Sequence, residues 1–162
     1  FDQQLVNRIE DASGVPATTT MTAVLAALDA LNIEKIGVAT SYIKNVDTDL
    51  AQVLRASGRE VIKISGMGIL KSIDMGDIAP EMVYRFAREN LAEAIGAEGF
   101  LLSCGNWRTL ESIKPLEDEF GIPVITSNQT GIWQALQIAG IPTHGIKEAG
   151  QIFAVPTTLL DT

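Results

Sequence analysis

The sequence predicts an α/β fold in which a parallel sheet is flanked by helices. Four short apolar runs, at residues 35–40, 60–65, 99–103 and 122–127, have the length of strands and are rich in β-branched or bulky apolar residues. After each run comes a segment in which apolar residues recur at helical spacing. Strand and helix therefore alternate between residues 35 and 140. Consecutive strands that are joined by a helix run parallel, and helices then cover both faces of the sheet.

Two helices are expected before the first strand. Leu5, Val6 and Ile9 recur at helical spacing, and the stretch "ASGVP" should end that helix. The threonines of "TTTMT" are suitable N-caps for a second helix. Its expected apolar face consists of Val24, Leu25, Leu28 and Leu31.

The later helices each follow a strand. The segment 66–80 has three glycines and no period, which predicts a functional loop. Pro80 suits the first turn of the helix after it, whereas Pro115 predicts a break near Lys114. A last helix should cover 130–140 and end at Gly140. The inward residues that we expect are Ile43, Val46, Leu50, Val53 and Leu54 in a helix over 42–56; Val83, Phe86, Ala87, Leu91 and Ile95 after Pro80; and Leu110, Ile113, Leu116 and Phe120 around Pro115.

Composition excludes several partners. The chain has 162 residues and a formal net charge of −8, so nucleic acid and anionic membrane surfaces would repel it. Its single cysteine cannot form an internal disulfide, which favours a reducing, cytoplasmic location. No apolar run has the length of a membrane span, and no signal segment leads the chain. The chain opens at Phe1 inside an amphipathic pattern, and we expect further sequence upstream.

Small polar side chains follow three of the predicted strands. The stretch "TSY" ends the first, "CGNWRT" follows the third, and "SNQT" follows the fourth. Ligands of open parallel sheets bind beyond the carboxyl ends of the strands, next to helix N-termini that have unpaired N–H groups. We therefore expect Cys104 and its neighbours to line an edge that suits a carboxylate or a developing enolate.

Each of these residues also has an ordinary structural explanation. Cys104 could fill the core, since free cysteine is among the most buried residue types. Tyr42 could shield the core while its hydroxyl stays at the surface. Ser127, Asn128 and Thr130 are common N-cap residues.

Other chemistry is not supported by the motifs. One cysteine and one histidine do not make a zinc site, so we expect no metal, and His144 is interpreted as a surface residue. The "GMG" at 66–68 lacks the following lysine of a phosphate-binding loop and is interpreted as a turn.

Five stretches, colinear through nearly the whole chain, carry a resemblance to a known family. They are "GVPATTTMTAVLAALDAL", "IGVATSYIKNVD", "LLSCGNWRTLESI", "LEDEFGIPVITSNQTGIWQALQIAG" and "GQIFAV". Together they resemble the aspartate/glutamate racemase superfamily, and within it the branch of maleate cis–trans isomerases, arylmalonate decarboxylases and ectoine-utilisation proteins. The resemblance implies two similar α/β halves, with the active site between them and one key cysteine position in each half.

The resemblance also implies a division of the chain. Residues 1–32 would be the terminal helices of an incomplete first half, and residues 33–140 the second half, which carries Cys104. Residues 141–162 would return to the first half. The cysteine loop of the first half would then precede Phe1.

Particular residues receive roles from the same resemblance. Cys104 corresponds to the catalytic cysteine of the second half, and Tyr42 to a tyrosine that hydrogen-bonds a substrate carboxylate. The backbone N–H groups of Gly105 and Asn106 would face the same anion. Further substrate-binding candidates are Thr18, Thr19 and Ser72, the last at a position where the isomerases carry an asparagine.

The implied activity is chemistry without a cofactor, at a carbon next to a carboxylate. We expect first a maleate cis–trans isomerase that acts on a small dicarboxylate through cysteine chemistry. A decarboxylase of the arylmalonate type and an Asp/Glu-type racemase are alternatives, because "CG" resembles the decarboxylases and "NWRT" the isomerases. A non-catalytic carboxylate-binding domain is the alternative outside enzymes. The family tendency also implies a homo-oligomer.

Overall fold

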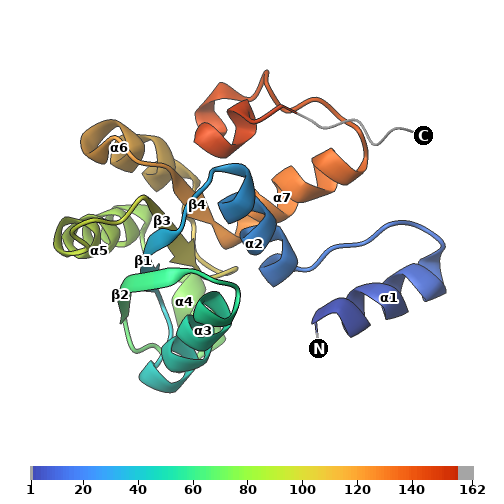
Figure 1. Cartoon of the computed structure of the whole chain (residues 1–162). Helices are drawn as coiled ribbons and strands as arrows, with labels where there is room; N and C mark the ends of the chain where they lie inside the picture. The colour runs from blue at the N-terminus through green and yellow to red at the C-terminus, as the bar shows by residue number, and fades with distance from the viewer. Residues whose placement is uncertain (1, 157–162) are drawn as a thin grey trace.

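The computed structural model describes residues 2–156, apart from the side chain of Lys147, and this part of the chain folds around a sheet of four parallel strands (Figure 1). The strand order is β2-β1-β3-β4. The strands are β1 (Lys35–Thr40), β2 (Glu60–Gly66), β3 (Gly99–Ser103) and β4 (Val124–Thr126). The helices are α1 (Asp2–Ser13), α2 (Thr20–Ala30), α3 (Lys44–Ala56), α4 (Ser72–Gly76), α5 (Pro80–Glu93), α6 (Leu110–Phe120) and α7 (Ser127–Ile138), followed by the 3-10 turns η1 (Lys147–Ala149) and η2 (Gln151–Ala154).

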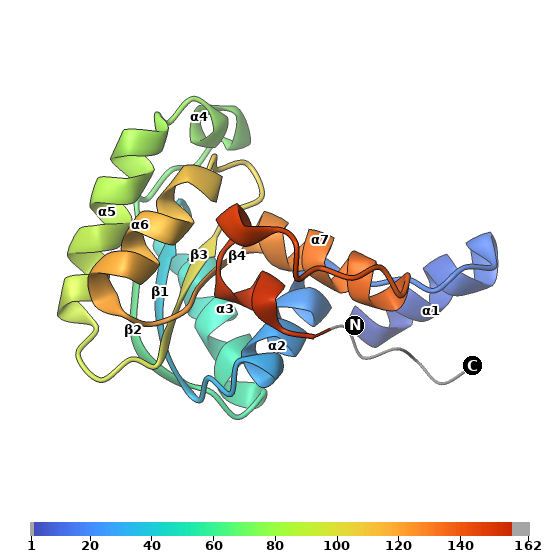
Figure 2. The same cartoon turned by 90° about the horizontal axis from the view of Figure 1, so that it is seen from above.

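Helices cover both faces of the sheet, as predicted (Figure 2). Helices α2, α3 and α7 pack on one face, and α5 and α6 pack on the other. Successive strand residues enter opposite layers, so Leu101 joins the core of α3 and α7 while Phe100 and Leu102 join that of α5 and α6. The predicted parallel α/β sheet flanked by helices is therefore confirmed.

The centre of the sheet is tightly packed. Every residue of β3 is buried. On the neighbouring strand, a Cβ atom at Gly37 would lie 2.6 Å from the ring of Phe100. Glycine is needed there because any side chain would displace that ring from a close-packed core.

The expected break at Pro115 is wrong, because α6 runs unbroken from Leu110 to Phe120. A proline inside a helix removes one N–H bond, here the bond to the carbonyl of Glu111. Glu111 lies in the first turn and is exposed, so water can bind its carbonyl instead.

The start of α7 also differs from expectation. The strand ends at Thr126 and the helix begins at Ser127, three residues before the predicted start. The cause is a capping box: the Thr126 hydroxyl accepts from the Gln129 N–H, and the Gln129 side chain accepts from the Thr126 N–H.

Several residues expected to point inward are exposed. Ile95 is 86% exposed because α5 ends at Glu93, before it. Val46, Val53 and Leu110 are exposed as well. Helices α3 and α6 therefore bury only some of the apolar residues that were expected to face the core. The segment 66–80, predicted as a loop, contains the short helix α4.

Helix α1 projects from the body of the molecule (Figures 1 and 2). The Asp2 carboxylate accepts hydrogen bonds from the hydroxyls of Thr19 and Thr22, which joins α1 to the start of α2. Val6 is buried, whereas Leu5 and Ile9 on the same face stay partly exposed. The division at residues 32 and 140 remains a prediction.

The C-terminal segment is fastened to α6 by a buried carboxylate. Glu117 accepts hydrogen bonds from the N–H of Val124 at 3.0 Å and of Gln151 at 3.1 Å. Burial raises the pKa of Glu117 above its ordinary value, although these hydrogen bonds oppose the shift. Within residues 2–156, every helix is too short or too polar to span a bilayer.

We predict that Glu117→Gln keeps the fold and removes the part of the pH dependence of stability that comes from Glu117. Because the folded state holds this proton more tightly than the unfolded chain, stability falls as pH rises from about 4.5 through the raised pKa. A glutamine can still accept both N–H bonds but carries no charge. Urea unfolding at several pH values should therefore show a smaller fall for this variant than for the wild type.

The matched variant is Glu117→Ala, which leaves the buried Val124 N–H and the partly buried Gln151 N–H without this acceptor. It should lose about 1–3 kcal/mol at neutral pH. Equal losses for the alanine and glutamine variants at neutral pH would contradict this account of Glu117.

Candidate active site around Cys104

Three strand ends meet at one edge of the sheet, as the sequence predicted. The pairing aligns Thr40 with Ser103, and Leu102 with Thr126, so β1, β3 and β4 finish side by side. The residues that follow these strands are therefore brought together although they are far apart in the sequence. Tyr42 comes from β1 and Cys104 from β3.

Cys104 lies in a small apolar cluster at this edge. Its side chain is 2% exposed and packs with Val83 and Trp107. The Cys104 Sγ lies 3.9 Å from the Sδ of Met75 in α4. Residues of the α4 region thus cover the thiol, and α4 lies at the same end of the molecule as the loop that follows Cys104 (Figure 2).

The phenol of Tyr42 belongs to the same cluster and faces Cys104 and Ser103. Burial, followed by the electrostatic effect of Cys104, raises the pKa of the Tyr42 phenol above its ordinary value. A raised pKa keeps the hydroxyl protonated, so Tyr42 can serve as a hydrogen-bond donor through the neutral pH range.

The backbone around Tyr42 is held from two sides. Its N–H donates to the Thr40 hydroxyl at 3.0 Å, and its carbonyl accepts from the Gly68 N–H at 3.0 Å. The Thr40 hydroxyl in turn donates to the buried Asp47, whose pKa is raised by burial in spite of that bond. A Cβ atom at Gly66 would lie 2.3 Å from the Tyr42 carbonyl oxygen, so glycine is required at this crossing.

The loop after Cys104 is pinned through its carbonyl and a side chain. The Gly105 carbonyl accepts from the Asn128 amide at 3.0 Å. The Asn106 amide donates to the carbonyl of Ser72 at 2.9 Å and to its hydroxyl at 2.6 Å. The Trp107 N–H closes the turn on the Cys104 carbonyl at 3.2 Å.

Two backbone donors remain open in this loop. Gly105 and Asn106 are exposed, and their N–H groups have no acceptor among residues 2–156. Free N–H groups that point out of a loop can bind an anion such as a carboxylate. The loop therefore carries two open donors directly after Cys104, whose side chain packs with Tyr42.

The other predicted site residues have different surroundings. Ser72 meets the site through Asn106. Thr19 is the N-cap of α2, and its hydroxyl donates to Asp2 at 2.6 Å. Thr18 lines a hollow with Ile138 at the far end of α7. The structure thus groups Ser72 with Cys104, whereas substrate binding by Thr18 and Thr19 remains a prediction.

Sequence reasoning missed Met75 and Trp107. Met75 lies in a one-turn helix without any periodic signal, and the Trp107 ring packs edge-on against Phe86 at 6.3 Å. His144 is exposed, as expected. Among the described residues, no group of three or more His, Cys, Asp and Glu side chains is placed to hold a metal ion.

Comparison with known sequences gives relatives with two different activities. A family model of arylmalonate decarboxylase matches residues 1–153. The chain is 33% identical over 158 residues to arylmalonate decarboxylase of Bordetella bronchiseptica. This match covers 94% of this chain and 64% of that protein. It is 22% identical over 145 residues to maleate isomerase of Alcaligenes faecalis, and this match covers 90% of this chain and 56% of that protein.

Solved structures agree with these matches. A crystal structure of arylmalonate decarboxylase superposes with a TM-score of 0.83 at 30% identity and covers 94% of this chain and 67% of that one. A Nocardia farcinica maleate cis–trans isomerase mutant with a covalently bound succinylcysteine intermediate gives a TM-score of 0.84 at 20% identity, with coverage of 94% and 63%. The second likeness shows a shared fold.

The chain spans 64% of the length of the curated decarboxylase and 56% of that of the isomerase. The resemblance seen in the sequence is confirmed by the family model and by the decarboxylase. The chain belongs to the arylmalonate decarboxylase family, within the aspartate/glutamate racemase superfamily.

Proposed function

We propose that this protein is a decarboxylase, without a cofactor, of malonate-type acids, and that Cys104 supplies the proton that replaces the lost carboxylate. The observation that carries the proposal is that the Tyr42 phenol packs in the same cluster as the Cys104 thiol, and that Gly105 and Asn106, which follow this cysteine, are exposed with open N–H groups. A family that includes arylmalonate decarboxylase supports the choice of reaction.

The proposed reaction has two steps. In the first, the bond between the central carbon and one carboxylate breaks, CO2 leaves, and the bonding electron pair moves into the remaining carboxylate to give an enediolate. Tyr42 and the two N–H groups stabilise the negative charge that develops on its oxygens. In the second, Cys104 donates its proton to the central carbon, and the resulting thiolate regains a proton from water.

Access to the thiol requires a movement near α4. Met75 lies against Cys104, which is 2% exposed, so we expect the Met75 side chain to be among those that move before a substrate carbon reaches the sulfur. Methionine suits this role because its unbranched side chain has several rotatable bonds. Gly105 and Asn106, which carry the two backbone donors, are in contrast exposed before any movement.

We propose decarboxylation ahead of maleate isomerisation, which is the reverse of the preference expected from the sequence. The sequence alone favours maleate isomerisation, whereas the chain is 33% identical to the decarboxylase and 22% identical to the isomerase. An isomerase would use a thiolate that adds to the double bond of maleate, and this reaction is an outcome of the test below. The racemase, the homo-oligomer and the cytoplasmic location remain predictions.

Cys104→Ala in the full-length protein should lower the decarboxylation rate by about 10²–10⁴, since it removes one positioned proton donor. Proton NMR of parallel incubations with phenylmalonate and with maleate measures both reactions. Thermal unfolding of the variant is the control for its fold.

The wild-type protein should consume phenylmalonate faster than it converts maleate to fumarate. The opposite preference would restore the isomerase. Binding of carboxylates without turnover of either compound would favour a non-catalytic domain.

Tyr42 should titrate late. In a Tyr84→Phe background, the ultraviolet absorbance change that is lost on the further substitution Tyr42→Phe reports Tyr42, and we expect its midpoint above the ordinary value of 10.0. Because the folded state resists deprotonation of this phenol, stability should be complete below pH 10 and fall as pH rises through the raised pKa.

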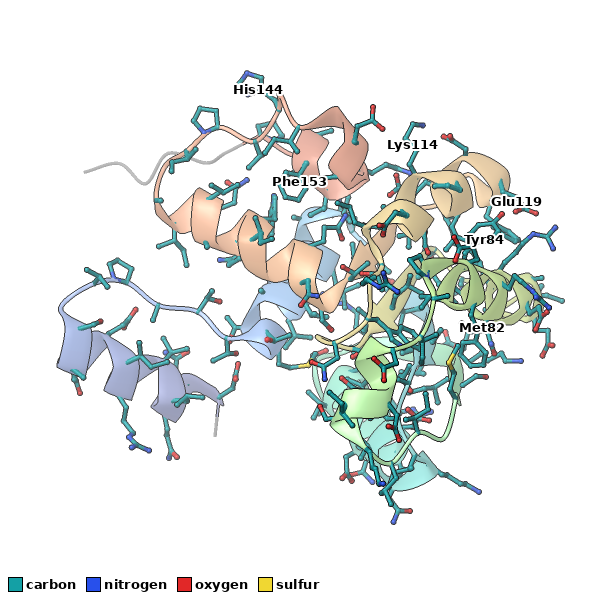
Figure 3. The ribbon with its side chains drawn as sticks, turned by 180° about the vertical axis from the view of Figure 1, so that it is seen from behind. Met82, Tyr84, Lys114, Glu119, His144 and Phe153 are labelled. Atoms are coloured by element: carbon teal, nitrogen blue, oxygen red, sulfur yellow. The ribbon has the colours of Figure 1, made fainter. Side chains whose placement is uncertain are left out.

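Tyr84 is a suitable residue to remove because it packs in the core of α5 and α6 and not in the Cys104 cluster; its hydroxyl donates to the exposed Glu119 (Figure 3). The Tyr42→Phe variant provides the matched control and should lose the absorbance change at high pH that belongs to Tyr42. A Tyr42 midpoint at or below the ordinary value would contradict the buried position of the phenol.

A further inference from the structure

The geometry points to Asn128 as a positioning residue that acts through the Gly105 carbonyl to aim the Asn106 N–H at the substrate carboxylate. The inference rests on the proposed function, because it concerns the same anion site. Its basis is the hydrogen bond, 3.0 Å long, from the Asn128 Nδ2 to the Gly105 oxygen.

A peptide unit converts that bond into an orientation. The carbonyl of Gly105 and the N–H of Asn106 belong to one planar trans peptide and therefore point in opposite directions. When the Asn128 amide binds the Gly105 oxygen, the N–H of Asn106 must therefore point away from Asn128. A single side-chain amide thus determines the direction of a main-chain donor that Asn128 itself does not touch.

Sheet topology indicates where that direction leads. Strand β3 lies between β4 and β1. Asn128 is in the first turn of α7, directly after β4, so the Gly105 oxygen points toward the β4 side. The Asn106 N–H consequently points toward the β1 side, where Tyr42 follows its strand. The phenol and this N–H are thereby directed at the same anion.

The alternative explanation for Asn128, an ordinary helix cap, does not fit. The N-cap of α7 is Thr126, whose hydroxyl accepts from the Gln129 N–H. Thr130 donates back to the Thr126 carbonyl, and the Gln129 amide also reaches the carbonyl of Ala149. The N-cap position is thus occupied by Thr126, and the exposed Asn128 amide binds the Cys104 loop instead.

Loss of Asn128 should therefore change an orientation and not the fold. The Asn106 side chain is still anchored on Ser72, and the Trp107 N–H still closes the turn. Without Asn128, the peptide between Gly105 and Asn106 can rotate away from its donor geometry. Binding of a carboxylate should weaken while the thiol keeps its surroundings.

The test compares Asn128→Ala and Asn128→Gln with the wild type, all as full-length protein. Calorimetric titration with phenylacetate, a carboxylate that cannot lose CO2 by the proposed reaction, measures binding without catalysis. We expect the alanine variant to raise Kd about tenfold, the effect of one hydrogen bond to a charged group. The glutamine variant keeps the donor and should recover most of the affinity.

Two further readouts exclude a general structural effect. The rate at which iodoacetamide alkylates Cys104 and the unfolding temperature should be unchanged in the alanine variant. Asn7→Ala is the matched control, because Asn7 is also an exposed asparagine on a helix, and its side chain is hydrogen-bonded only to that of Gln3 within residues 2–156. Its Kd should equal that of the wild type.

Each outcome decides between the two proposals. Wild-type affinity in Asn128→Ala overturns the positioning role and leaves the decarboxylase proposal intact. Equal losses of affinity in the alanine and glutamine variants also overturn it. No binding of phenylacetate by the wild type overturns both proposals at the carboxylate site.

Discussion

The parallel pairing of β3 with β1 on one side and β4 on the other is the constraint on which the candidate site depends. It brings Tyr42, Cys104 and Asn128 to one edge of the sheet from three distant parts of the sequence. Each chain segment then turns into a helix on the same edge, which keeps the intervening loops short and their N–H groups near the surface. A shift in this register would separate Cys104 and its loop from Tyr42 and Asn128.

Exposure is divided unevenly within the site. The thiol is buried with Met75 and Trp107, while Gly105 and Asn106 are open to solvent. This division suits a substrate whose charged carboxylate stays at the edge while the adjacent carbon enters an apolar cluster. Developing charge is stabilised more strongly by hydrogen bonds when water is excluded around it. The same burial keeps the Tyr42 phenol protonated.

The sequence was informative where a feature is periodic and less so where it depends on competition between local contacts. The alternation of strands and helices predicted the sheet, and the polar residues after three strands predicted the edge at which they gather. Pro115 was misleading because the exposed start of α6 tolerates a lost hydrogen bond. The contact of Met75 with Cys104 could not be predicted from the sequence, because α4 is a single turn and has no periodic pattern of apolar residues. Asn128 resembled a cap until the structure placed Thr126 in that role.

The central claim is that the N–H groups of Gly105 and Asn106 bind the substrate carboxylate. The most direct measurement is a titration of the 15N-labelled full-length protein with phenylacetate, followed by NMR at these two amides. The account predicts saturable downfield shifts of both amide protons, larger than those elsewhere in the loop, as each gains a charged acceptor. Saturable shifts confined to other parts of the protein, with these two amides unmoved, would contradict it.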